Sequence, residues 1–150
     1  MNIIYKIDIA SILIIIPILI GILSKPDDWY FNLKKPELTP PGYVFGIAWS
    51  ILYTLIAISY YLALWDKSFA YWIIPIIHLL LNYSYTPLIF VYKRLLESAI
   101  ITSLVLLTAI IVMILFYKYG NMISVYLLIP YIIWLSFANY LAWSVYTLNK

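Results

Sequence analysis

The stretch WYFNLKKPELTPPGYVFGIAWSILY, from Trp29 to Tyr53, joins a polar, proline-rich loop to the start of an aromatic helix. A second stretch, NYSYTPLIF from Asn82 to Phe90, places an asparagine, two tyrosines and a proline inside an apolar run. Polar groups within a membrane-spanning segment are costly and usually have partners there. Together the two stretches indicate a membrane protein built around an aromatic pocket.

Composition requires that hydrocarbon surrounds most of this chain. Of its 150 residues, 66% are hydrophobic and only 10% are charged, and the mean hydropathy is +1.01. A water-soluble domain of this size needs more polar surface to cover its core. A helix crosses a bilayer with about 20 apolar residues, so five such segments use nearly the whole chain. The expected fold class is therefore all-α, a single domain over residues 1–150 that forms a five-transmembrane-helix bundle.

The expected spans are separated by short polar connections. They run approximately over Ile3 to Leu23, Pro41 to Leu64, Ala70 to Tyr92, Leu95 to Tyr117 and Met122 to Leu148. The first resembles a signal peptide, but its apolar stretch is long and Ser24-Lys25-Pro26 is a poor cleavage site, so we interpret it as a retained span. Prolines interrupt the third span at Pro75 and Pro87, which neighbouring helices can accommodate.

Basic residues favour one orientation in the membrane. Five spans put the termini on opposite sides, with Lys6, Lys67 and Lys118 on the N-terminal side. The other side carries six basic residues, namely Lys25, Lys34, Lys35, Lys93, Arg94 and Lys150. The positive-inside rule then places the C-terminus and the long first loop in the cytoplasm of this multi-pass protein.

Several function classes find no support in the sequence. There is no cysteine and only one histidine, which argues against a His-cluster metal site. No basic stripe indicates nucleic acid, no Ser-His-Asp arrangement or phosphate loop is evident, and catalytic residues stay unknown. Every carboxylate lies near the end of a span or in a loop, whereas proton-coupled pumps keep ionisable groups inside. The expected partner of most of the surface is therefore the lipid bilayer.

His78 and Asn82 are the polar side chains placed deepest in the third span, and their four-residue spacing puts them on one helix face. His78 is either an axial ligand or proton donor in a pocket, or a neutral histidine hydrogen-bonded to a neighbouring helix, which is the favoured interpretation. Asn82 needs a partner from another helix or from a ligand.

Aromatic residues recur beside small ones on two other spans. Trp49 and Tyr53, like Trp134 and Ala138, are four residues apart and share a face. Large rings beside small residues form either a flat slot for a planar ligand or simply a packed core. Small residues on the second span permit close helix packing or a homodimer; they are Gly46, Ala48, Ser50, Ala57 and Ser59.

These motifs resemble the tryptophan-rich sensory protein family, also called the translocator protein or peripheral benzodiazepine receptor family. The first loop and second span match at Trp29-Tyr30, Leu33, Lys35-Pro36, Pro40-Pro41, Val44-Phe45-Gly46, Trp49 and Leu52-Tyr53. The third span matches at Asn82, Pro87 and Phe90, and the fifth at Pro130-Tyr131, Trp134, Phe137-Ala138, Leu141 and Asn149. The chain departs from the family's pattern at Tyr43, Ala57, Tyr83, Tyr85, Ile89 and Ala142.

The resemblance implies a five-helix membrane receptor or carrier, often a homodimer, with a ligand pocket below the first loop. Carried over by position, the pocket residues are Trp49, Tyr53, Asn82, Tyr85, Trp134 and Ala138. Family ligands include porphyrins such as protoporphyrin IX and haem, and sterol-like molecules; no cofactor is required. Leu141, Tyr146 and Lys150 fit the loose sterol motif of animal members.

Three functions follow as alternatives. The first is binding of a flat hydrophobic ligand, a tetrapyrrole above all. The second is enzymatic, since some bacterial members are reported to degrade protoporphyrin IX in light through the tryptophans that match Trp49 and Trp134. The third is a structural or regulatory bundle whose aromatic core binds nothing.

Overall fold

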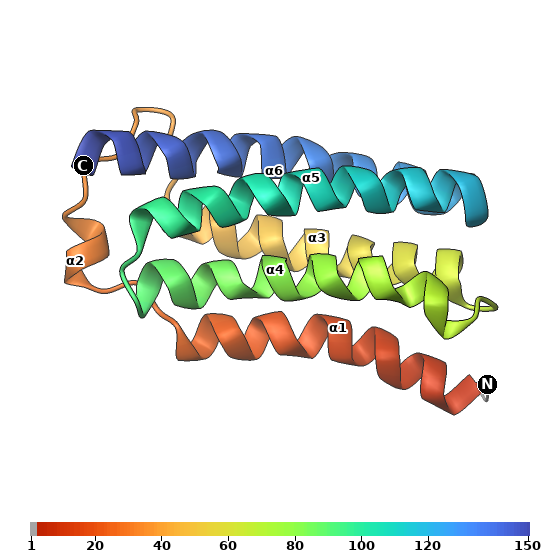
Figure 1. Cartoon of the computed structure of the whole chain (residues 1–150). Helices are drawn as coiled ribbons and strands as arrows, with labels where there is room; N and C mark the ends of the chain where they lie inside the picture. Colours follow the sequence, from red (N-terminus) through yellow and green to blue (C-terminus); the bar gives the residue numbers. More distant parts are fainter. Residues whose placement is uncertain (1–2) are drawn as a thin grey trace.

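The computed structural model describes the backbone of residues 3–150 and the side chains from residue 12 onward. Within this range the chain is all-helical, with no strand, and the main helices lie alongside one another (Figure 1). They are α1 (Ile3–Leu23), α2 (Asp28–Phe31), α3 (Gly42–Leu64), α4 (Ile73–Phe90), α5 (Leu95–Tyr119) and α6 (Met122–Asn149), with a 3₁₀ turn, η1, at Phe69–Trp72.

The helices form a closed ring. α1 packs against α3 and α4, α6 packs against α3 and α5, and α4 packs against α5. The start of α1 and the C-terminus lie at opposite ends of the bundle (Figure 1). Large side chains remain exposed on the outer faces, as expected where lipid is the solvent; examples are Ile18, Ile51, Leu80, Leu107 and Ile133.

Four helical segments are long and apolar enough to cross a membrane, and they are Gly42–Leu64, Phe69–Phe90, Leu95–Tyr119 and Met122–Asn149. In α1 the described side chains form a shorter apolar segment, Ile12–Leu23. The all-helical membrane fold is therefore confirmed, whereas the crossing of α1, and with it the count of five spans, stays a prediction. The side chain of Lys6, which contributes to the predicted orientation, lies outside the described residues.

Prolines and polar caps explain where the helices begin. Pro41, the expected start of the second span, lies just before α3 with an extended ψ of 148°. Pro75 falls in the first turn of α4, where its missing N–H costs nothing. Asn121 caps α6, because its side-chain oxygen accepts a hydrogen bond from the backbone N–H of Ser124 at 2.9 Å.

The core lies between α3, α5 and α6 and mixes aliphatic with aromatic residues. Ile56, Tyr60 and Phe116 are almost fully buried, and the rings of Tyr60 and Phe116 meet edge-on at 5.2 Å. Ser59 donates a hydrogen bond to the carbonyl of Ser124 at 2.8 Å. Ala57 and Ser59 therefore pack inside the chain, whereas Gly46 and Ser50 remain exposed on α3.

Candidate functional site

Aromatic rings from the first half of α3 meet rings from the middle of α6. The Trp49 ring stacks on Tyr53 with centroids 5.3 Å apart and an interplanar angle of 27°. The ring of Trp134 stands perpendicular to Trp49 at 6.5 Å. We call this group, all half-buried, the aromatic cluster; its members are Phe45, Trp49, Tyr53, Trp134 and Phe137.

A buried polar network adjoins the aromatic cluster. Asn82, only 5% exposed, accepts a hydrogen bond from the Tyr53 hydroxyl at 2.7 Å. Its amide nitrogen donates to the hydroxyl of Tyr131 at 2.7 Å. Asn82 therefore joins α3, α4 and α6 at one point, which satisfies the requirement that an amide in an apolar interior has partners.

His78 extends the same network toward α5. Its side chain is fully buried, with Nε2 lying 3.0 Å from the Tyr131 hydroxyl and Nδ1 lying 2.8 Å from Oγ1 of Thr108. Both ring nitrogens thus have partners on neighbouring helices, and neither is free to bind an iron atom. The interpretation of His78 as a hydrogen-bonded structural histidine agrees with this geometry.

The structure brings four of the six predicted pocket residues into contact, namely Trp49, Tyr53, Asn82 and Trp134. Ala138 lies one helical turn beyond Trp134 on the same face of α6. Tyr85 makes no ring contact or hydrogen bond with the aromatic cluster in the described part of the chain. Its place in a ligand pocket stays a prediction.

Sequence reasoning did not place Tyr131 or Thr108 in the site, although Tyr131 belongs to the matched motif of the fifth span. Tyr131 is 1% exposed and contacts both His78 and Asn82. The one signal for Thr108 was a hydroxyl within the apolar stretch of α5 between Ser103 and Tyr117. Their importance depends on contacts between helices, which the spacing along one helix does not reveal.

One hydrogen-bond donor in the aromatic cluster is left without a partner. The indole Nε1 of Trp134 is buried and has no acceptor among the described residues. An unsatisfied buried donor costs about 1–3 kcal/mol. A ligand with an acceptor at this place would remove that cost.

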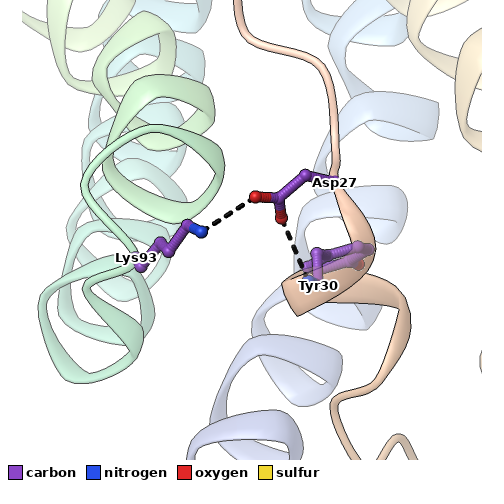
Figure 2. A network of polar contacts seen from close by, with 3 residues as sticks. All are labelled: Asp27, Tyr30 and Lys93. Atoms are coloured by element: carbon purple, nitrogen blue, oxygen red, sulfur yellow. Dashed lines mark hydrogen bonds and ion pairs between the residues drawn. The ribbon is translucent and has the colours of Figure 1, made fainter.

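The first loop is fixed to the end of the bundle by α2. The Asp27 carboxylate caps α2 by accepting a hydrogen bond from the backbone N–H of Tyr30 at 3.3 Å, and it forms an ion pair with Lys93 at 2.8 Å (Figure 2). Lys93 also lies over the ring of Trp29, 5.4 Å from its centroid. The hydrogen bond from Lys93 lowers the pKa of Asp27 below its usual value of 3.8.

Lys93 has an unusual backbone that suits this contact. Its φ is 56°, in the left-handed region that costs a residue with a side chain about 1–2 kcal/mol. The turn is closed by a hydrogen bond from the backbone N–H of Arg94 to the carbonyl of Leu88 at 3.0 Å. The short α4–α5 connection thereby presents the Lys93 ammonium to the loop.

The other end of the loop is tied to the C-terminal turn of α6. The side-chain oxygen of Asn149 accepts a hydrogen bond from the backbone N–H of Lys34 at 3.0 Å. The amide nitrogen of Asn149 donates to the carbonyl of Lys34 at 2.8 Å. Lys35 donates to the carbonyls of Tyr30, Phe31 and Leu33, and partial burial lowers its pKa. The ring of Tyr30 meets Phe90 edge-on at 4.8 Å, so the loop is anchored at several points.

Removing the charge of Asp27 should loosen the loop without unfolding the bundle. In Asp27→Asn the side chain can still cap α2 but loses the ion pair with Lys93. We expect faster amide hydrogen exchange in residues 27–36 and little change in Tm. Because the folded state depresses the pKa of Asp27, the contact is present at neutral pH and is lost as pH falls through that lowered pKa.

Asp28→Asn is the matched control, since Asp28 lies one residue further on in the first turn of α2. Exchange is corrected for its intrinsic pH dependence in both variants. Equal protection of the loop in the wild type and in Asp27→Asn would show that the ion pair does not hold the loop.

A separate hollow of about 260 Å³ lies at the opposite end of the bundle. It is lined by the ends of α3 and α5 and by the start of α4, and it includes Lys67, Tyr71 and Tyr119. No member of the aromatic cluster contributes to it. It is therefore distinct from the site that the sequence predicted.

A comparison with protein families matches residues 9–148 to the model of the TspO/MBR family. This chain belongs to the TspO/MBR family. It is 36% identical over 126 residues to an uncharacterised membrane protein, YtaB, from Bacillus subtilis, with 81% of each chain covered. It is 33% identical over 124 residues to the tryptophan-rich protein TspO of Bacillus cereus, covering 81% of this chain and 80% of the relative.

The tryptophan-rich sensory protein of Cereibacter sphaeroides is 32% identical over 134 residues, which cover 89% of this chain and 84% of that protein. The resemblance to this family is thus confirmed over most of the chain. Membership in the TspO/MBR family, together with four apolar helices long enough to span a bilayer, makes this an integral membrane protein.

Proposed function

We propose that this protein is a membrane receptor or carrier that binds a flat hydrophobic ligand of the tetrapyrrole class, such as protoporphyrin IX or haem. The observation that supports this most is the aromatic cluster, in which the Trp49 ring contacts both Tyr53 and Trp134 and the Tyr53 hydroxyl bonds to Asn82. Stacked and perpendicular rings offer flat apolar area, and Asn82 with the free N–H of Trp134 offers orientation.

The anchored loop suits the role of a cover for such a site. Its contacts with Lys93 and Asn149 are polar and exposed, so they can open at small cost. Sterol-like ligands are the alternative occupants of the same apolar surface. The loop and the C-terminus lie on the cytoplasmic side in this proposal, because six basic residues lie there against three on the other side. A homodimer also stays a prediction.

The test is a titration of the purified protein in detergent with protoporphyrin IX in the dark, followed by quenching of tryptophan fluorescence. We expect saturable binding that weakens about tenfold or more in Trp49→Ala and in Trp134→Ala, because each substitution removes a stacking surface. Trp143→Ala is the matched control, since Trp143 lies on α6 outside the aromatic cluster and bonds to Ser103. Binding to the wild type that does not saturate would contradict the proposal. Affinity in Trp49→Ala and Trp134→Ala equal to that of the wild type would also contradict it.

Light-dependent breakdown of the bound porphyrin is a second candidate. It is favoured by the 6.5 Å separation of the Trp49 and Trp134 rings, which places two oxidisable indoles at one site. Illumination of the saturated samples in air distinguishes the two functions. A new absorbing product that forms only with an intact Trp134 supports turnover, whereas porphyrin loss equal to that in empty detergent supports binding alone.

A further inference from the structure

The polar network has a single direction, and a backbone carbonyl sets it. Oγ1 of Thr108 lies 2.8 Å from the carbonyl oxygen of Leu104, one helical turn earlier on α5. A carbonyl only accepts hydrogen bonds, so the hydroxyl proton of Thr108 is used there. The Thr108 oxygen can then only accept from His78 Nδ1, 2.8 Å away.

The position of the proton on His78 follows from that contact. A neutral imidazole carries one N–H, and a fully buried ring among apolar helices stays neutral. With the proton on Nδ1, the bare Nε2 must accept, and its partner at 3.0 Å is the hydroxyl of Tyr131. Tyr131 therefore donates to His78.

The same logic continues to the aromatic cluster. Having given its proton to His78, the Tyr131 oxygen accepts from the amide nitrogen of Asn82 at 2.7 Å. The amide oxygen of Asn82 then faces Tyr53 and accepts its proton, also at 2.7 Å. The hydroxyl proton of Tyr53 is thereby committed, and only the lone pairs of its oxygen remain for any other partner.

A second proton arrangement would give Tyr53 the opposite character. If the imidazole proton lay on Nε2, Tyr131 would accept it and donate to Asn82, whose amide would turn over and donate to Tyr53. The Tyr53 proton would then be free for a ligand. In this arrangement the Thr108 hydroxyl would donate to Nδ1 of His78 and could no longer donate to the Leu104 carbonyl. The wild-type contacts therefore select the first proton arrangement.

We propose that Thr108 and His78 are positioning residues that fix the hydrogen-bond polarity of the ligand site. They make Tyr53 an acceptor only, in the same aromatic cluster whose Trp134 carries a free indole N–H, a donor only. A ligand that presents an N–H or O–H donor to Tyr53 and an acceptor to Trp134 therefore suits the site, whereas a carboxylate beside Tyr53 does not. Resting on the proposed function, this inference selects the metal-free tetrapyrrole, whose core has two N–H groups and two bare nitrogens, over its metal complexes.

The chain offers a direct measurement of this polarity, because His78 is its only histidine. Labelling with ¹⁵N-histidine gives the nitrogen NMR signals of one side chain. We expect the purified wild-type protein, without ligand, to show a protonated Nδ1 and a bare Nε2. Thr108→Val should move the proton to Nε2, and Thr108→Ser, which keeps the hydroxyl, should restore the wild-type spectrum. A wild-type imidazole protonated at Nε2 overturns the inference.

Ligand selectivity is measured on the same variants in the dark with protoporphyrin IX and its nickel(II) complex. Nickel(II) accepts a square-planar site, so the two ligands differ mainly in the inner N–H groups. We expect the wild type to bind the metal-free ring about tenfold more tightly, the ratio that one ordinary hydrogen bond provides. In Thr108→Val the ratio should fall to about one, and in Thr108→Ser it should return.

Thr147→Val is the matched control, since the Thr147 hydroxyl bonds only to the Trp143 carbonyl of its own helix among the described residues. Thr147→Val should keep the wild-type nitrogen spectrum of His78 and the wild-type ratio of affinities for the two porphyrins. Equal affinity of the wild type for the two porphyrins, with binding intact, overturns the selectivity. Failure of either porphyrin to bind any protein instead contradicts the proposed function, while the NMR spectrum still decides the direction of the network.

Discussion

Shortening Tyr131 to alanine is expected to lower the free energy of unfolding by about 2–3 kcal/mol. The side chain is 1% exposed, and its ring contacts Trp49 at 6.3 Å and His78 at 5.7 Å between centroids. Removal leaves a void of about 100 Å³, and a cavity costs roughly 24 cal/mol per Å³. The transfer term is small here, because an unfolded helix in lipid is also in an apolar medium.

Tyr131→Phe separates packing from hydrogen bonding in the same position. It keeps the ring but removes the partner of Asn82 and His78, so we expect a smaller loss of about 1–2 kcal/mol. Both variants are measured by reversible unfolding in mixed micelles, with Tm as a second readout. Should Tyr131→Ala be no less stable than Tyr131→Phe, the ring would not be a packing element of the core.

The helices were largely predictable because the membrane imposes their length. The first span was expected over Ile3 to Leu23, and α1 has those bounds. The fourth was expected to end at Tyr117, but α5 continues to Tyr119 before Gly120 ends it. A hydrophobic run of about 20 residues bounded by charges leaves few alternatives. Helix ends were therefore correct to within about three residues, the largest difference being the start of α4 at Ile73 instead of Ala70.

The short helix α2 was missed for a physical reason. Its four residues, Asp28–Phe31, are too few to show a periodic pattern. The helix forms because Asp27 caps its start. The ammonium group of Lys35 also holds its end, by donating hydrogen bonds to the carbonyls of Tyr30, Phe31 and Leu33. Those contacts depend on how the loop folds back on itself, which no pattern in the loop sequence encodes.

The candidate site was predictable in part. The shared face of His78 and Asn82 was read from their spacing, and both side chains do contact Tyr131. The partners themselves were not predictable, because Tyr131 lies 49 residues beyond Asn82 and Thr108 lies 30 residues beyond His78. Spacing identifies a helix face, whereas the packing of the ring of helices decides what that face meets.

The contact between Gly120 and α3 gives the second large expected effect on stability. A Cβ added at Gly120 would lie 2.8 Å from the carbonyl oxygen of Phe116 and 3.0 Å from the Cβ of Ala63. The first of these neighbours is backbone and cannot turn away. Gly120→Ala is therefore expected to destabilise the protein by about 1–3 kcal/mol, the usual cost of overpacking a tight contact.

Gly46→Ala is the matched control, because a Cβ added at Gly46 meets nothing within 4 Å. Gly46 lies inside α3, where alanine is favoured over glycine by about 0.5–1 kcal/mol. The same substitution should thus lower Tm at position 120 and raise it at position 46. Because both changes add one methyl group, effects of the same sign would mean that the close approach of the α5–α6 turn to α3 does not limit the fold.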